Sequence, residues 1–220
     1  MNHAAILITA LILPLAACNN SDGGQSAGSE GGAGDGSTVV KLHPLERFCI
    51  TYKHTGTLSG TSTQCSRKWG TESYTIEDLA ISMGSISQPQ KSHKITIGDT
   101  IYVIDPDKMT GTRTRNPLYD QLINADTEQL AQSMMAAMQL KDTGEDKQIA
   151  GESCNVLSSP MGVGGCYTDS MVALEVNAMG LVQTATSVDL SSFGDDANYA
   201  LYEQAEITEG PDIDAIMKKL

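Results

Sequence analysis

The sequence predicts an α+β fold in which antiparallel strands are interrupted by one helical stretch. The first observation is a β-meander over residues 151–190, where strand-like runs are separated by turns at 160–165 and 177–180. The second is the alternation of apolar and polar residues from Phe48 to Lys53, which is typical of a half-buried strand. The third is a change to a helical period over residues 117–140.

Further strand-like runs precede the helical stretch. They are residues 58–69, residues 73–82, two short strands within 94–104 that meet at a turn at Gly98-Asp99, and residues 109–115. Within the helical stretch, Leu130, Met134 and Met138 recur every four residues. The strands are predicted to resume at Gln148. Residues 211–220 predict a short final helix, because proline suits a first turn and lysine suits a last turn.

Length and composition predict one folded domain, which we place at residues 39–220. The chain has 220 residues, and 40% of them are hydrophobic, which is enough for a single core. Residues 18–38 are rich in Gly and Ser and predict a disordered, flexible linker. The formal net charge is −13. Since no basic run is long enough to follow a phosphate backbone, nucleic acid is not expected as a partner.

The N-terminus is similar to that of a secreted bacterial lipoprotein. Residues 4–13 form an apolar run too short to span a bilayer, so residues 1–17 are predicted to be a signal peptide. The segment LAAC ending at Cys18 resembles a lipobox, which implies that Cys18 carries lipid and anchors the chain to a membrane. Asn19 resembles the residue that follows the cysteine in outer-membrane lipoproteins, whose domains face the periplasm or the cell surface. The alternative is ordinary secretory cleavage beside an unrelated cysteine.

Four further cysteines suggest two disulfides. Four cysteines allow three pairings, and the hairpin spacing favours Cys49–Cys65 and Cys154–Cys166, since a turn is predicted midway in each pair. Disulfides suit a compartment outside the cytoplasm. Four buried thiols are the alternative. Zinc is less favoured, because the sequence has no CxxC or HxxxH.

Two motifs match catalytic or metal-binding patterns by letter only. Residues 24–28 read GQSAG, but a serine-hydrolase elbow needs a strand and a helix on either side, and both flanks here lack apolar residues. Asp105 and Asp107 suggest a calcium loop, but the residue at the bidentate position is Asn116 rather than glutamate. We interpret the first as a product of composition and the second as a plain turn.

The histidines and methionines define no catalytic or metal site. His43, His54 and His93 have no acid or nucleophile at a revealing spacing, so no catalytic residue, metal ligand or cofactor is predicted. The methionines allow three interpretations: a packed helix face, soft ligands for Cu(I), or the wall of a site for apolar ligands. The packed face is the commonest of these, and an adaptable apolar site comes second.

The order of the motifs resembles bacterial LolA-like lipoproteins and their DUF4412-type relatives. The run KITIGDTIYVIDPDKMTGTRTR at 94–115 is followed by a helix, then by IAGESC at 149–154, Cys166-Tyr167 and Gly180. This resemblance implies a strongly curved antiparallel sheet, an open half-barrel, with helices across its concave face. In that superfamily of lipoprotein carriers and envelope-stress regulators, the cavity commonly holds lipid or lipoprotein acyl chains.

The leading functional hypothesis is therefore a lipid-anchored envelope lipoprotein that binds an apolar ligand, a lipid or an acyl chain, without catalysis. The candidate ligand-binding residues are Met134, Met135, Met138, Val156, Met171, Ala173 and Leu181. The alternative is a structural or regulatory envelope module that binds a protein partner through its sheet edge or acidic surface. A hydrolase is the third hypothesis, because catalytic groups can meet in space without a sequence motif.

Overall fold

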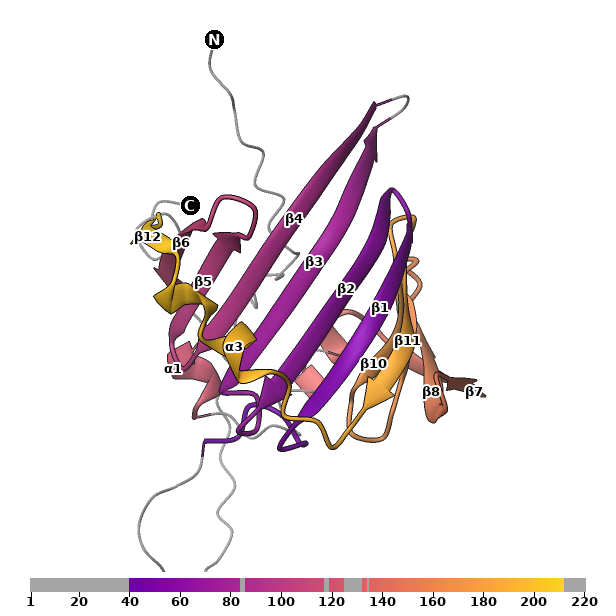
Figure 1. Cartoon of the computed structure of the whole chain (residues 1–220). Helices are drawn as coiled ribbons and strands as arrows, with labels where there is room; N and C mark the ends of the chain where they lie inside the picture. Colours follow the sequence, from indigo (N-terminus) through magenta and orange to yellow (C-terminus); the bar gives the residue numbers. More distant parts are fainter. Residues whose placement is uncertain (1–39, 84–85, 117–118, 125–131, 134, 212–220) are drawn as a thin grey trace, which may run out of the picture. The chain divides into compact units, whose positions relative to one another are not determined.

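A computed structural model describes residues 40–83, 86–116, 119–124, 132–133 and 135–211 of the chain (Figure 1). The chain divides into two units, Met1–Thr38 and Val39–Leu220, and all described residues belong to the second. The predicted signal peptide, the lipidation site at Cys18, the linker and the GQSAG motif lie outside the described residues. So does the final helix predicted from the C-terminal sequence, apart from Pro211.

The described part of the chain is built on one 12-stranded sheet. Its strands are β1 (Phe48–Gly56), β2 (Leu58–Arg67), β3 (Glu72–Met83), β4 (Ile86–Ile97), β5 (Thr100–Asp105), β6 (Thr110–Arg115), β7 (Lys141–Ile149), β8 (Glu152–Ser158), β9 (Gly164–Tyr167), β10 (Ala173–Ala178), β11 (Leu181–Asp189) and β12 (Glu206–Glu209). Their order in the sheet is β12-β6-β5-β4-β3-β2-β1-β11-β10-β9-β8-β7. Each described neighbouring pair is antiparallel except β12 and β6, which are parallel. Figure 1 shows the long strands β1 to β4 side by side, with β11 to β7 continuing beyond β1.

The predicted fold class, an α+β half-barrel with helices across a concave face, is wrong. The structure is mainly one large mixed sheet, and α1 (Tyr119–Leu122) and α3 (Asp196–Tyr199) have four residues each. The strands return at Lys141 rather than at Gln148. The prediction failed because the periodicity of a short segment shows only which of its residues share an apolar face. The extent of a strand depends instead on hydrogen bonds and side-chain contacts with strands that are distant in the sequence. A short helix gains little stability without a packed apolar partner.

Close backbone contacts set the turn between β1 and β2. Gly56 has a φ of +100°, and a Cβ added there would lie 1.9 Å from the carbonyl oxygen of Gly180, at the turn between β10 and β11. The N–H of Thr57 also donates to that oxygen at 3.4 Å. Only glycine fits at position 56, since a side chain would clash with the backbone of the neighbouring turn.

The outer half of β4 is an open sheet edge among the described residues. β3 pairs with β4 from Ile86 to Ile97, whereas β5 pairs with β4 only from His93 onward. Pro89 lies in the unpaired part, next to Gln90 and Lys91. Proline has no N–H for a ladder hydrogen bond, and lysine resists burial, so both discourage an added strand at this edge.

Two buried clusters hold the sheet together. The first cluster brings β1 and β11 together with β8, β9 and β10, and it consists of Phe48, Ile50, Tyr52, Cys154, Cys166, Val172, Leu174 and Ala185. The second cluster lies under the C-terminal residues, and it consists of Cys65, Tyr74, Ile95, Ile104 and Tyr199. The predicted alternation in β1 therefore matches its burial, because Phe48, Ile50 and Tyr52 all belong to the first cluster.

Residues 192–209, which we name the C-terminal strap, follow β11 and cross the sheet to reach β6. The strap contains α3, the 3-10 helix η1 (Leu201–Glu203) and β12. Figure 1 shows it in yellow, with α3 on β3 and with β12 beside β6. No described helix is long and apolar enough to cross a membrane.

Candidate functional site

Tyr199 of α3 anchors the strap on the sheet. Its side chain is 2% exposed. The ring meets Tyr74 of β3 edge-on, with ring centroids 4.7 Å apart and an interplanar angle of 77°. The guanidinium carbon of Arg67 lies 3.8 Å from the centroid of the Tyr199 ring. These aromatic and cation–π contacts add to the burial of the ring, which by itself is worth about 1.5–3 kcal/mol for a large apolar side chain.

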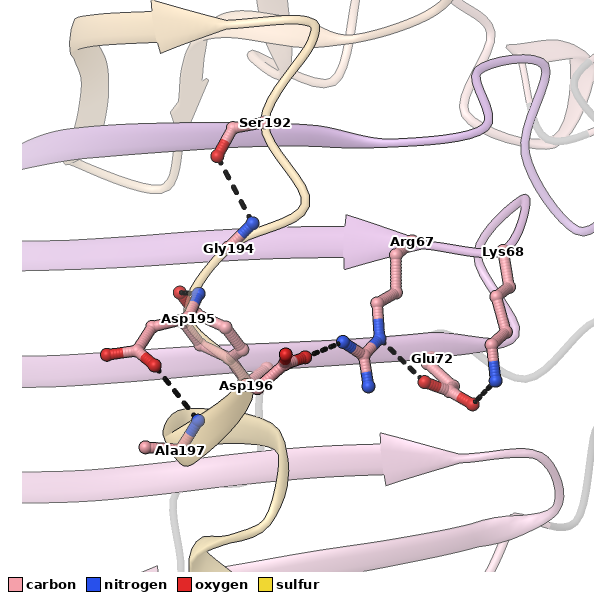
Figure 2. Close-up of polar contacts among 9 residues, drawn as sticks. Arg67, Lys68, Glu72, Ser192, Gly194, Asp195, Asp196 and Ala197 are labelled. Carbon is pink, nitrogen blue, oxygen red and sulfur yellow. Dashed lines mark hydrogen bonds and ion pairs between the residues drawn. The ribbon is translucent and has the colours of Figure 1, made fainter.

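A chain of ion pairs joins the strap to the end of β2 and the start of β3 (Figure 2). Arg67 Nε donates to Glu72 Oε2 at 2.7 Å, and Lys68 Nζ donates to Glu72 Oε1 at 2.5 Å. Arg67 also reaches across to the carboxylate of Asp196 in α3. Because the side chain of Asp196 is 90% exposed, this link to the strap is worth only about 0–1 kcal/mol.

The ion pairs shift the pKa values of the groups that form them. Burial alone would lower the pKa of Arg67, but hydrogen bonds to Asp196 and Glu72 raise it above its usual value. Burial alone would raise the pKa of Glu72, but hydrogen bonds from Lys68 and Arg67 lower it. Glu72 therefore stays ionised, and Arg67 stays oriented between the sheet and the strap.

The first residues of the strap are fixed by local hydrogen bonds (Figure 2). The N–H of Gly194 donates to Ser192 Oγ at 3.1 Å, and the N–H of Ala197 donates to Asp195 Oδ1 at 2.9 Å. Asp195 is therefore the N-cap of α3. Gly194 has a φ of +73°, and an added Cβ would lie 2.9 Å from the ring of Tyr74. Glycine lets the strap approach the sheet closely at this point.

β12 at the end of the strap completes the sheet at β6. The N–H of Glu206 donates to the carbonyl of Met109 at 2.9 Å, and the N–H of Gly210 donates to the carbonyl of Arg113 at 2.8 Å. Arg113 Nε donates to Glu209 Oε1 at 2.7 Å. Because Arg113 and Glu209 are 54% and 70% exposed, backbone hydrogen bonds rather than this ion pair hold β12 in place.

In the described part of the chain, two buried polar atoms at the interface between strap and sheet have no hydrogen-bond partner. They are the Tyr199 hydroxyl and His93 Nε2, and both rings pack on Tyr74. Burial lowers the pKa of His93, opposed by a hydrogen bond with the backbone of Asn198, and burial also raises the pKa of Tyr199. An unsatisfied buried donor or acceptor costs about 1–3 kcal/mol. The interface between strap and sheet therefore carries a built-in energetic cost.

A row of polar side chains lies on the face of β1 to β4 that points away from the strap. His54 Nε2 and Ser62 Oγ are 2.8 Å apart, and Ser92 Oγ donates to Glu77 Oε2 at 2.5 Å. Ser62 faces Glu77 across β2 and β3, and Glu77 faces Ser92 across β3 and β4. Sequence spacing did not reveal this row. The signal that reveals it is the strand register, since paired residues share a face.

This polar row falls short of a catalytic triad. His54 and Ser62 are within the reach needed for a base and a nucleophile, but each is only 6% exposed. His54 Nδ1 is buried without a hydrogen bond, while the carboxylate of Glu77 accepts from Ser92. Burial lowers the pKa of His54, and the nearby charge of Glu77 opposes that shift. We interpret the row as a structural set of polar contacts.

The structure places the four later residues predicted to line a ligand cavity in different parts of the sheet and its loops. Val156 packs against the first cluster. The carbonyl of Ala173 accepts a hydrogen bond from the hydroxyl of Tyr52 at 2.8 Å. Leu181 is half-buried at the start of β11, and Met171 lies in the loop before β10 with a φ of +59°. Val156 is thus part of the protein's own packing, while Met171 is positioned by a turn.

The predicted methionine face is only partly described. Met135 and Met138 are half-buried, and Met134 lies outside the described residues. Two later methionines are exposed at hairpin turns, namely Met161 at 57% and Met179 at 81%. The methionine face therefore stays a prediction.

Asp105 and His43 have local partners. Asp105 Oδ1 accepts the N–H groups of Asp107 and Lys108 at 3.1 Å each, as in a plain turn. The hydrogen bond from the Lys108 ammonium lowers the pKa of Asp105. His43 Nδ1 accepts the N–H of Leu45 at 3.0 Å. The described residues contain no group of three or more His, Cys, Asp or Glu placed to hold a metal ion.

The structure contains two disulfides, Cys49–Cys65 and Cys154–Cys166. Cys49 lies directly opposite Cys65 across β1 and β2, with Cα atoms 4.1 Å apart. The second pair is diagonal, because Val156 rather than Cys154 lies opposite Cys166. Its Cα atoms are 5.3 Å apart. The two bonds close separate hairpins, as expected for a protein that folds outside the reducing cytoplasm.

Comparisons with known proteins yield weak structural similarities. No protein-family model matches the chain, and no curated protein sequence matches it. An uncharacterized conserved protein from Thermus thermophilus has a TM-score of 0.49 and 6% identity, with 78% of this chain and 94% of that chain covered. MucB has a TM-score of 0.41 and 10% identity, with 77% of this chain and 62% of MucB covered. Because both TM-scores are below 0.5, neither similarity indicates a function, and the DUF4412 resemblance gains no support from a family match.

Proposed function

We propose that this protein is a non-catalytic binding module of the bacterial cell envelope that docks a protein partner. The observation that carries the proposal is the packing inside the first cluster, where Ile50 is 1% exposed and Leu174 is 0% exposed. A lipid or acyl chain needs an apolar space to enter, whereas these side chains fill that region by contacting one another. We therefore favour binding of a protein partner at the exposed surface or edge of the sheet over enclosure of an apolar ligand inside the protein.

The proposed location outside the cytoplasm is supported by the disulfides and by the N-terminal sequence. The Cys49–Cys65 and Cys154–Cys166 bonds suit an oxidising compartment. The LAAC segment supports lipid attachment at Cys18 and an anchor in the outer membrane. Replacing Cys18 with Ala should move the protein from the membrane fraction to the soluble fraction. Continued membrane association of the variant would overturn the anchor.

Cross-linking in cells tests the proposed protein partner. The wild-type chain, treated with a short amine-reactive cross-linker, should give one dominant protein adduct of constant mass. A Cys18→Ala variant is the matched control, because it removes the proposed lipid anchor but changes no residue of the described fold. Adducts that form only because the protein is held at the membrane should disappear in this variant. The proposal fails if folded wild-type protein gives no adduct above the background of an unrelated lipoprotein of similar charge.

An apolar ligand is the second candidate, because Met135 and Met138 remain partly exposed in a helical segment. Flexible thioether side chains adapt to varied apolar shapes. Native mass spectrometry of protein purified from cells should then show a lipid-mass adduct that a Met135→Gln/Met138→Gln variant loses. A clean unliganded spectrum from folded wild-type protein would overturn this candidate.

A further inference from the structure

We propose that the outer edge of β6 is the docking site and that β12 is an internal occupant which a strand of the protein partner replaces. The partner would supply an extended segment parallel to β6. It would place an apolar side chain at the position of Ile207 and a carboxylate at the position of Glu209. This inference rests on the proposed function, since it names the surface and the chemistry by which the module recognises a protein.

β12 joins the sheet as a strand added in parallel at its edge. β12 is the one parallel strand in the described sheet, and its four residues pair from Glu206 opposite Thr110 to Glu209 opposite Arg113. It is delivered by the strap rather than by a hairpin with its neighbour. Backbone hydrogen bonds at a sheet edge accept any extended segment of suitable register. The β6 edge thus already works as an acceptor for an added strand.

The β6 edge offers an added strand an apolar contact and a basic side chain. Ile207 lies opposite Gly111 and packs against the second cluster, which gives the added strand an apolar anchor. Arg113 pairs with Glu209, two residues further along. The Arg113 side chain at this edge favours a carboxylate at the position directly opposite it. This edge therefore prefers a partner strand with an apolar residue followed two positions later by an acidic residue.

The polar contacts of the strap are weak enough for a partner strand to compete with β12. Its ion pairs with Arg67 and Arg113 are made by exposed carboxylates, with Asp196 90% and Glu209 70% exposed. Its buried Tyr199 hydroxyl has no hydrogen-bond partner. Tyr202 of η1 stacks on Tyr102 of β5 with ring centroids 4.4 Å apart, so the strap still covers apolar surface while in place. A partner strand therefore competes with a four-residue strand whose ion pair is weak and which is held mainly by its backbone hydrogen bonds and by Ile207.

A pair of variants tests the displacement. Thr112 and Thr208 are direct partners across β6 and β12, so a Thr112→Cys/Thr208→Cys variant locks β12 in place when oxidised. A Glu209→Lys variant weakens the attachment of β12 by placing a positive charge beside Arg113, and the exposure of Glu209 keeps the fold intact. A Tyr199→Ala variant loosens the strap in a second, independent way, because it removes the buried ring that anchors α3 on the sheet. Circular dichroism checks the fold of all three.

The probe is a fluorescent peptide with the sequence of residues 203–211, and binding is measured by anisotropy. We expect the Glu209→Lys and Tyr199→Ala variants to bind it at least ten-fold more tightly than the oxidised lock, and reduction of the lock to restore part of the binding. A peptide carrying Glu209→Lys should bind at least ten-fold more weakly. Equal binding to the folded loosened variants and the folded lock, or equal binding of both peptides, would overturn the inference.

Cross-linking in cells separates this inference from the proposed function. If the oxidised lock abolishes the dominant protein adduct, both are supported. If the adduct persists unchanged in the lock, the β6 site is overturned while the protein partner stands. If the peptide discriminates between the variants but no adduct forms in cells, the strand-accepting edge stands and the proposed function is overturned.

Discussion

Replacing Tyr199 with Phe should stabilise the protein, although Tyr199 is one of its most buried side chains. The ring would keep its contacts with Tyr74 and Arg67. The substitution removes a hydroxyl that is buried without a hydrogen bond. An unsatisfied buried polar group costs about 1–3 kcal/mol, so the free energy of unfolding should rise by about 1 kcal/mol. For a domain of this size, the melting temperature should rise by about 2–4 °C.

Urea unfolding followed by fluorescence or circular dichroism measures the effect, with Tyr74→Phe as the matched control. The Tyr74 hydroxyl accepts the N–H of Asp195 at 3.3 Å, so its removal should destabilise the fold by about 0.5–1.5 kcal/mol. A loss of stability of about 1 kcal/mol or more in Tyr199→Phe would refute the reasoning. Such a loss would mean that the hydroxyl has a partner, such as an internal water molecule.

Three further predictions concern stability. A Cys49→Ser/Cys65→Ser variant should lose about 3 kcal/mol of unfolding free energy in urea titrations, because its bond closes a loop with a sequence separation of 16; an unchanged midpoint would contradict this. A Gly56→Ala variant should lower the melting temperature by several degrees, since its Cβ would clash with Gly180, and equal stability would contradict the geometry. Burial lowers the pKa values of His54 and His93, so the unfolded state binds more protons. Stability should be full above about pH 6.5 and should fall below it by up to about 1.4 kcal/mol per pH unit for each histidine; a flat stability profile between about pH 6.5 and 4.5 would refute this.

The strands near the N-terminus of the described domain could be predicted, but the C-terminal strap could not. The alternation from Phe48 and the turn glycine at Gly56 are local signals, and the structure has β1 and its turn there. The strap depends on Tyr199 meeting Tyr74, and on Asp196 meeting Arg67. These partners are far apart in the sequence, so no periodicity or spacing reports them. The His54–Ser62 contact was missed although its residues are only eight apart in the sequence, because the diagonal register between β1 and β2 is what brings the two side chains together.

By itself, the sequence determined the turns, the period-two strands and the hairpin pairing of the cysteines, because each depends on residues close together in the chain. Only the tertiary structure decided that the strands join one mixed 12-stranded sheet and that Val156 is used in the protein's own packing. It also decided that β12 adds in parallel to β6. The physical reason is that backbone hydrogen bonds between strands are the same for every sequence, so the choice of partner depends on long-range packing rather than on a local pattern.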